Sequence, residues 1–276
     1  MIISDEQLYK LKQIELDIFK NFINVCQKLN LKYYLLGGTL LGAVRHEGFI
    51  PWDDDIDVGM PRKDYEVFIS KGQEMLPKKY FIQNFYSDLD FPLNFTKIRD
   101  NETTFLETSV RKLNINHGVF IDVFPLDFYP NKEKERNRIK IKKKILDSRI
   151  SSAFYFNKKR FSFKLCLLKV VSHMFYPSIS KAVQKKEKLY KSVTDGKFLV
   201  NHSGAWGDKE VVPAEWYGEG CLLKFNGLEV VAPKEYDKWL SQVYGNYMIF
   251  PPEESRIPHH YIDIIDLEKS YLEYKK

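Results

Sequence analysis

Four aspartates in five consecutive positions, 53–57, constrain this chain more than any other feature of its sequence. The run leads straight into apolar residues that continue to position 60. Because side chains alternate across a β-strand, a strand over 55–60 places Asp55 and Asp57 on one face and their apolar neighbours on the other. Two carboxylates on one face repel each other and resist burial, and a hard divalent cation removes both difficulties. The pattern therefore predicts that Asp55 and Asp57 bind Mg²⁺ or Mn²⁺.

Three other interpretations explain the acidic run less well. A calcium-binding loop that starts at Asp53 requires Gly at its sixth position and Glu at its twelfth, where this chain has Val58 and Asp64. A solvated acidic turn accounts for clustered aspartates, but not for the alternation of Asp with Ile56 and Val58, and a helix cap needs one aspartate rather than four. We therefore prefer the metal site.

Upstream of the acidic run, a Gly-Gly-Thr turn at Gly37, Gly38 and Thr39 precedes a segment, 39–46, with the spacing of a short helix. Glycine allows a backbone to approach a phosphate closely, and a helix N-terminus supplies free N–H groups and the positive end of a dipole. Such a turn is common by itself. Because Asp-apolar-Asp follows it on a strand, the pair predicts a site for a phosphate-bearing substrate.

A two-metal site, with ions roughly 3.5–4 Å apart, needs a further carboxylate. Asp122 is the best candidate because it lies in an otherwise apolar strand over 119–124, where an aspartate is costly unless its charge is compensated. Asp127 is the alternative, but it follows Pro125 and has the sequence context of a turn residue. We therefore expect Asp122 to join the metal ligands.

The N-terminal segment, 5–29, has the pattern of an amphipathic helix. Ser4 and Gln7 form a capping box at its start, and apolar residues follow at helical spacing with one break in the stripe, at Glu15. Further along, Asn226-Gly227 lies between two strand-like runs and predicts a β-hairpin. The other elements that we expect are strands over 33–36, 80–85 and 95–99, and helices over 61–75, 131–150 and 233–243.

Composition and cysteine spacing exclude several classes of protein. With 44% hydrophobic and 15% aromatic residues, the 276-residue chain is typical of a globular protein rather than a disordered one. No uncharged apolar stretch reaches about 18 residues, and no basic start followed by an apolar run indicates a secretory signal. The three cysteines are far apart, which favours neither a disulfide framework nor a cysteine zinc site and suits a reducing cytoplasm.

The positive charge is concentrated in one block. Between positions 131 and 191 there are 19 Lys and Arg against 4 Asp and Glu, a local net charge of +15, whereas the whole chain carries +6. A basic block in an otherwise acidic protein predicts an anionic partner surface, and segment 158–171 combines lysines with bulky apolar residues as in a helix that lies in a membrane interface. The alternatives are solvated, salt-bridged helices for the charges and packing onto the core for the apolar residues.

The segment from Gly37 to Asp57 resembles the signature of the LicD family, which includes bacterial phosphocholine transferases and is related to the fukutin group of polyol-phosphate transferases. The resemblance continues through 97–100, 118–127 and 251–260, and the basic block matches it least. It implies an α+β fold with a nucleotidyltransferase-like core, a small mixed sheet flanked by helices. On this basis we expect three parts: a catalytic core over 1–130, a basic helical block over 131–192, and a C-terminal part over 193–276 whose hairpin and helix complete the catalytic domain.

The same resemblance implies transfer of a phosphocholine or related phospho-alcohol group from CDP-choline, or another CDP-alcohol, to a hydroxyl of a cell-surface glycan or its lipid-linked precursor. Asp55, Asp57 and Asp122 match the metal ligands of the family, and the turn 37–39 matches its donor-phosphate turn. No zinc is expected, because the chain lacks the cysteines of the zinc-binding insertion found in animal members. Further substrate contacts are predicted for the basic side chains of Arg45, His46, Lys97, Arg99, Arg256, His259 and His260.

Several of these assignments have simpler alternatives. Lys97 and Arg99 suit donor phosphates, or else are surface charges on an edge strand. Arg45 and His46 suit phosphate or acceptor contacts, or else the cationic end of a short helix. Two other functions stay open: a nucleotidyltransferase that moves a nucleoside monophosphate, and a non-catalytic nucleic-acid-binding protein, which leaves the acidic strand unexplained. We expect a cytoplasmic enzyme that is peripheral to the inner face of the membrane and does not bind nucleic acid.

Overall fold

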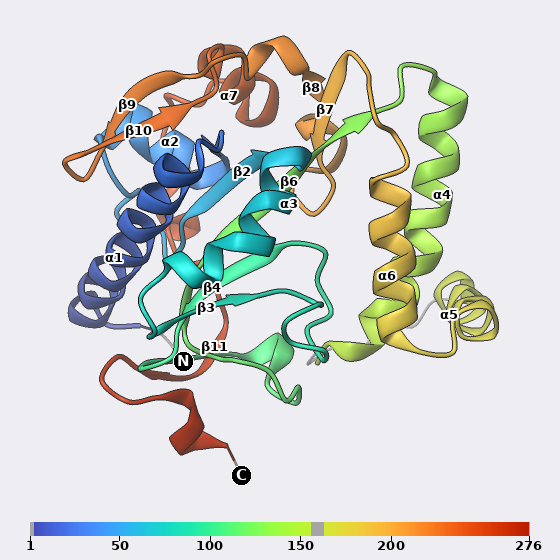
Figure 1. Ribbon diagram of the computed structural model, residues 1–276, viewed down its shortest axis with the longest axis horizontal. Coiled ribbons are helices and arrows are strands. Elements are labelled where there is room, and N and C mark those ends of the chain that lie inside the picture. The colour runs from blue at the N-terminus through green and yellow to red at the C-terminus, as the bar shows by residue number, and fades with distance from the viewer. Residues whose placement is uncertain (1–2, 156–162, 276) are drawn as a thin grey trace.

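A seven-stranded mixed sheet forms the centre of the protein, in a computed structural model that describes residues 3–155 and 163–275, without the side chains of 163–166 (Figure 1). Its strands are β1 (Tyr34–Leu35), β2 (Asp57–Pro61), β3 (Tyr80–Gln83), β4 (Thr96–Asp100), β6 (Val119–Tyr129), β7 (Phe198–Asn201) and β8 (Val212–Pro213). The order along the sheet is β1-β2-β6-β4-β3, and β7 pairs with both β6 and β8. Neighbouring strands are antiparallel except β2 and β6, which are parallel.

Four helices flank this sheet. They are α1 (Asp5–Leu29), α2 (Gly37–His46), α3 (Arg62–Lys71) and α7 (Tyr236–Tyr244). The capping box predicted at the start of α1 is present, with Ser4 and Gln7 bonding reciprocally. Helices α1 and α3 pack against β6 and against each other, and the rings of Phe22 and Phe68 meet edge to face with centroids 5.2 Å apart. Helix α2 contacts β2 and α7, so its N-terminus is held close to the acidic run.

Two antiparallel ribbons complete the flanks of the sheet. The first is the predicted hairpin, β9 (Cys221–Phe225) and β10 (Leu228–Ala232), and both residues of its Asn226-Gly227 turn have positive φ, as a two-residue hairpin turn requires. The second joins β5 (Thr104–Glu107) to β11 (Ile262–Asp266). Because β5 and β11 are far apart in the sequence, this pairing brings the C-terminal segment back to the sheet.

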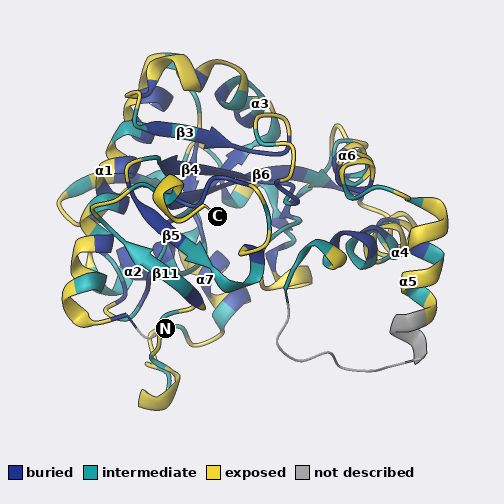
Figure 2. Ribbon diagram, turned by 90° about the horizontal axis from the view of Figure 1, so that it is seen from below, coloured by how far each residue is buried: buried dark blue, intermediate teal, exposed yellow. Residues whose placement is uncertain are grey.

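The basic block forms a separate helical lobe. Its helices are α4 (Glu133–Ile150), α5 (Phe163–Phe175) and α6 (Ile179–Tyr190), and Figure 2 shows them to one side of the sheet. The lobe has its own small apolar core, in which Leu146 and Ile150 of α4 pack with Ala182 and Val183 of α6. In the part of the chain that the structure describes, no helix is long and apolar enough to cross a bilayer.

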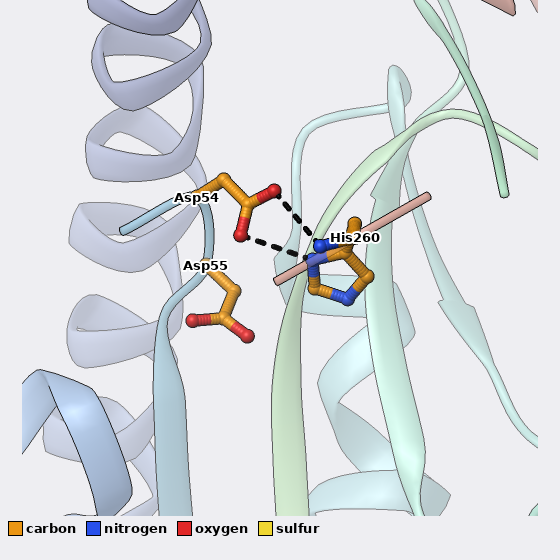
Figure 3. A group of neighbouring side chains, drawn as sticks. All are labelled: Asp54, Asp55 and His260. Atoms are coloured by element: carbon orange, nitrogen blue, oxygen red, sulfur yellow. Dashed lines mark hydrogen bonds and ion pairs between the residues drawn. The ribbon is translucent and has the colours of Figure 1, made fainter. Parts of the chain in front are cut away.

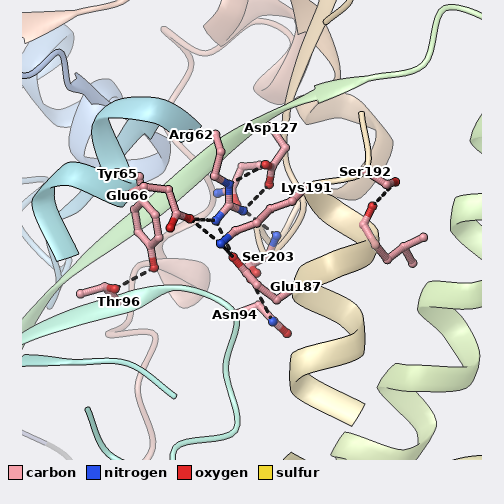
Figure 4. A network of polar contacts seen from close by, with 12 residues as sticks. Arg62, Tyr65, Glu66, Asn94, Thr96, Asp127, Glu187, Lys191, Ser192 and Ser203 are labelled. Carbon is pink, nitrogen blue, oxygen red and sulfur yellow. Dashed lines mark hydrogen bonds and ion pairs between the residues drawn. The ribbon is translucent and has the colours of Figure 1, made fainter. Parts of the chain in front are cut away.

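A buried ionic network joins the lobe to the sheet (Figure 4). Arg62 of α3 donates two hydrogen bonds to Asp127 of β6, at 2.7 and 2.6 Å, and one to Glu187 of α6, at 2.5 Å. Asn94 also donates to Glu187, at 3.1 Å. One guanidinium therefore connects a helix of the core, the central strand and a helix of the lobe.

The expected α+β class is confirmed, as are the predicted helix over 5–29, the strands at 80 and 119, and the 221–231 hairpin. Strand β2 begins at Asp57 rather than at position 55, and strands β5, β7, β8 and β11 were not predicted. The interpretation of Asp127 as a turn residue is wrong, because β6 continues to Tyr129. Asp127 is five positions from Asp122 and therefore faces the opposite side of the sheet. The nucleotidyltransferase-like label and the division into three parts stay predictions.

Candidate active site

A cavity of about 910 Å³ opens beside Asp57, at the start of β2, and Asp122, on β6. This volume lies within the ~300–1,000 Å³ range of small-molecule sites. Its lining comes from segments that are far apart in the sequence, namely residues in 36–45, 50–57, 95, 122–124, 201–210, 244–251 and 255–260.

The acidic floor of the cavity is built by strand register. Asp57 and Asp122 are direct partners on the parallel strands β2 and β6, so their side chains lie beside each other on one face of the sheet. Lys97 of β4 is the partner of Asp122 on its other side, with Nζ 3.0 Å from Oδ1 and a hydrogen bond donated to Oδ2 at 3.3 Å. Asp122 Oδ1 is buried and accepts no hydrogen bond.

Burial and mutual repulsion raise the pKa values of the floor carboxylates. Burial raises the pKa of Asp57 well above its usual value, and the charges of Asp55 and Asp122 raise it further. Asp55 lies just before β2 and lines the same cavity, where burial and the charge of Asp53 raise its pKa to about 7. Burial also raises the pKa of Asp122, although Lys97 opposes the shift. A set of crowded, buried carboxylate oxygens suits a hard cation such as Mg²⁺, which stays a prediction.

Asp54 has a different role from its acidic neighbours (Figure 3). Its carboxylate accepts hydrogen bonds from the backbone N–H groups of His259 and His260, at 3.0 and 3.2 Å, and lies 3.2 Å from His260 Nδ1. Burial disfavours the charged imidazole, but the bond to Asp54 and the charges of Asp55 and Glu107 outweigh it and raise the pKa of His260 to about 9.

Among the described residues, Asp54, Asp55 and His260 also bring potential metal-ligand atoms within 4.8 Å of one another. The oxygens of Asp54 already accept hydrogen bonds from the backbone N–H groups of His259 and His260. We therefore interpret the Asp54–His260 pair as a clamp that holds the C-terminal segment over the cavity, and a metal on the floor carboxylates stays a prediction.

The Gly-Gly-Thr turn is the first turn of α2 and faces the carboxylates. Gly37 has φ +53, and a Cβ there would lie 2.9 Å from Asp57 Oδ2; a Cβ on Gly38 would lie 2.5 Å from Asp53 Oδ2. Thr39 Oγ1 accepts the backbone N–H of Asp57 at 2.8 Å. Gly37 and Gly38 line the cavity, whereas Thr39 is not among the described lining residues and instead fixes the start of β2 against the turn.

The predicted basic residues near the cavity surround an aromatic ring. The guanidinium carbon of Arg45 lies 4.7 Å from the centre of the Phe250 ring, and that of Arg256 lies 5.5 Å from it. His46 meets the same ring edge to face. Arg45 lines the cavity, as do His259 and His260; His46 and Arg256 are not among the described lining residues.

Lys97 and Arg99 are not on an edge strand, because β4 lies between β6 and β3. Both side chains are buried, so the alternative of surface charges is wrong. Arg99 donates to Gln83 Oε1 at 2.8 Å and to the Gly118 carbonyl at 2.7 Å. Neither residue is among the described lining residues of the cavity. Lys97 pairs with Asp122 from the neighbouring strand β4, and Arg99 bonds to Gln83 and Gly118.

Other residues in or near the cavity were not predicted, and the first of them, Glu15, is not among the described lining residues. Glu15 is buried close to the acidic run, has an unpartnered Oε2, and has its pKa raised by burial and by the charge of Asp55. Glu15 is the residue that breaks the apolar stripe of α1, so this break in the sequence pattern could have identified it as a buried acidic residue. Trp206, Glu210 and Tyr244 line the cavity, but nothing in their local sequence distinguishes them from ordinary loop and helix residues.

The chain belongs to the LicD/FKTN/FKRP family, because the model of that family's nucleotidyltransferase domain matches residues 30–176. It is 30% identical to the lipopolysaccharide cholinephosphotransferase LicD of Haemophilus influenzae. The match extends over 250 residues and covers 89% of this chain and 92% of that protein. It is also 45% identical over 42 residues to the ribitol 5-phosphate transferase FKRP of human and mouse, covering 15% of this chain and 8% of those proteins. An uncharacterized protein of Rickettsia prowazekii is 30% identical over 135 residues, covering 46% of this chain and 47% of that protein.

Proposed function

We propose that this protein transfers a phosphocholine or related phospho-alcohol group from a CDP-activated donor to a hydroxyl of a glycan or of a lipid-linked glycan precursor. Two relatives support the class of reaction, since one is named a cholinephosphotransferase and the other a ribitol 5-phosphate transferase. Both names describe the transfer of a phosphorylated alcohol.

The observation that carries the proposal is the juxtaposition of a carboxylate pair and a helix N-terminus in one cavity. Asp57 and Asp122 are register partners, and the first turn of α2, with Gly37 and Gly38, lies directly against Asp57. The N-cap residue of α2, Leu36, offers no side-chain acceptor to the free N–H groups of that turn. Free N–H groups and a positive dipole end suit a phosphate next to the carboxylates.

The reaction is an in-line displacement at the phosphorus that bears the alcohol. The acceptor hydroxyl oxygen forms a new bond to this phosphorus, the bond to the CMP oxygen breaks, and CMP leaves with the electron pair. The hydroxyl proton passes to a floor carboxylate or to water, and Asp122 is the candidate acceptor because its Oδ1 accepts no hydrogen bond. When bound, Mg²⁺ or Mn²⁺ neutralises charge on the transferring and leaving phosphates.

The test is CMP release from CDP-choline, CDP-glycerol and CDP-ribitol, with an extracted glycan acceptor, in Mg²⁺ and in EDTA. We expect release from one of these donors only with metal, and a loss of about 10³-fold in Asp57→Asn and in Asp122→Asn, since metal stabilisation of the transferring phosphate contributes several kcal/mol. Asp90→Asn, an exposed aspartate outside the cavity, is the matched control and keeps full activity.

The products also separate the proposal from its rival. If label placed in the cytidine moves onto the acceptor, the protein is a nucleotidyltransferase and the proposal is wrong. Absence of CMP release from every donor with acceptor present also rejects it. Calorimetric titration of Mg²⁺ into wild type and Asp57→Asn measures metal binding independently of turnover.

We further propose that the enzyme docks on an anionic membrane through α5. Leu167, Val170, Met174 and Phe175 of this helix are between 56% and 77% exposed, whereas Leu168 is half-buried. The neighbouring helices α4 and α6 carry exposed lysines, and apolar residues together with lysines are typical of helices at anionic interfaces. The N-terminal part of the segment predicted to lie in the interface, residues 158–162, is outside the described residues.

A further inference from the structure

Two groups of aromatic residues in the cavity differ in the charge beside them. The first, which we call the arginine wall, consists of Trp52 and Phe250. Arg45 lies 4.7 Å from the Phe250 ring centre, and Arg256 lies 5.5 Å from the centres of both rings. Two permanent positive charges therefore already stand against these rings, and a third cation would be repelled there.

The second group, which we call the carboxylate corner, consists of Trp206, Tyr244 and Glu210. The rings of Trp206 and Tyr244 meet edge to face, with centroids 4.9 Å apart, and all three residues line the cavity. One cation, Lys209, also lies 5.4 Å from the Trp206 ring centre, where its ammonium donates to the Val243 carbonyl at 3.0 Å, whereas no cation–ring contact involves Tyr244 among the described residues.

Glu210 is held in place at this corner. Its side chain is buried, and Oε1 accepts a hydrogen bond from the backbone N–H of Trp206 at 2.9 Å. This bond fixes the carboxylate to the backbone of Trp206. Gly204 lets the backbone pack directly against this carboxylate, because a Cβ there would lie 2.0 Å from Oε1 and 2.2 Å from Oε2. No salt bridge of the described residues involves Glu210, and burial raises the pKa of Glu210 to about 7, so the corner combines two aromatic rings with a carboxyl group that a bound cation would hold in its charged form.

Aromatic faces attract desolvated cations, and recognition of quaternary ammonium groups by aromatic side chains is the best-known use of this interaction. We propose that Trp206, Tyr244 and Glu210 form the subsite that binds the quaternary ammonium head group of the donor, and that the arginine wall binds its negatively charged or nucleobase part. This inference rests on the proposed function and selects choline over glycerol and ribitol as the transferred alcohol.

Glu210 also has a simpler role, since its bond to Trp206 organises the loop over 201–206. A purely structural role weakens the use of every donor equally, whereas a cation subsite weakens only the use of charged donors. The two roles are separated by a neutral isostere of the donor, CDP-3,3-dimethylbutanol, in which carbon replaces the nitrogen of choline without changing its shape.

The experiment compares kcat/KM for CDP-choline with that for the isostere. We expect wild type to prefer CDP-choline about 30-fold, the upper range for a desolvated cation–aromatic contact. Glu210→Gln and Trp206→Leu each lower this preference about tenfold, mainly through KM for CDP-choline, while the isostere changes little. Glu215→Gln, which removes an exposed carboxylate of the same type outside the cavity, keeps the wild-type preference.

Each outcome has one meaning. If wild type uses CDP-choline but both variants lose activity equally toward the two donors, the subsite is wrong and the proposed function stands. Use of CDP-glycerol or CDP-ribitol alone by wild type also overturns the subsite. Absence of CMP release from every donor rejects the proposed function itself. Trp206 is 43% exposed, so Trp206→Leu keeps the test available if Glu210→Gln fails to fold.

Discussion

Replacing Arg62 by Met should destabilise the protein strongly, because it leaves two buried carboxylates without their cation. The Arg62 side chain is 16% exposed, and those of Asp127 and Glu187 are 2% and 5% exposed. Removing one partner of a buried ion pair costs about 3–5 kcal/mol. Lys191, 3.4 Å from Glu187, relieves part of this loss, so we expect about 3 kcal/mol.

For a chain of this size, each kcal/mol lowers the thermal midpoint by about 2–4 °C, so Arg62→Met should lower it by roughly 6–12 °C. Differential scanning calorimetry measures this shift. Adding Asp127→Asn to Arg62→Met should restore part of the loss, because the uncompensated charge is removed together with its partner. Lys32→Met, which breaks an exposed pair with Glu219, is the control and should leave the midpoint nearly unchanged. A midpoint for Arg62→Met equal to that of the control, or no recovery in the double variant, would refute the reasoning.

Two further predictions concern the site and the lobe. Gly38→Ala places a methyl group 2.5 Å from Asp53 Oδ2 in the cavity, so we expect kcat/KM for the donor to fall at least about tenfold with little change in the thermal midpoint; unchanged kcat/KM would mean that the turn does not face the donor. In vesicle flotation, wild type should bind anionic vesicles more strongly than neutral ones, and Val170→Asp with Met174→Asp should abolish the difference; equal binding of wild type to both vesicle types contradicts membrane docking by α5.

Local signals in the sequence predicted the elements that hold the site. The capping box at Ser4, the Asn226-Gly227 turn and the apolar run around Asp122 each identify an element from a few neighbouring residues. The Asp-apolar-Asp pattern likewise placed Asp57 on a strand. Short-range signals of this kind survive in the structure because turn geometry and side-chain alternation do not depend on distant contacts.

Interpretation was weaker wherever a side chain's role depends on its neighbours in space. The identity of Lys97 and Arg99 as basic residues on one strand was clear, but their burial follows from β4 lying between two other strands. Asp54 looked equivalent to Asp55 in the sequence, yet it accepts hydrogen bonds from His259 and His260, some 200 positions away. No local pattern contains such pairings.

The sequence by itself indicated the candidate residues of the floor: the glycine turn and the aspartates are recognisable because their conformational freedom and mutual repulsion make them unusual in a buried context. Only the tertiary structure decided which of them meet. The parallel register of β2 and β6 sets Asp57 beside Asp122, and the return of the chain after the helical lobe brings Trp206, Glu210 and Tyr244 to the same cavity. Contacts between residues far apart in the sequence are set by packing. The free energy of burial depends on the surface removed from water and not on the order of residues along the chain.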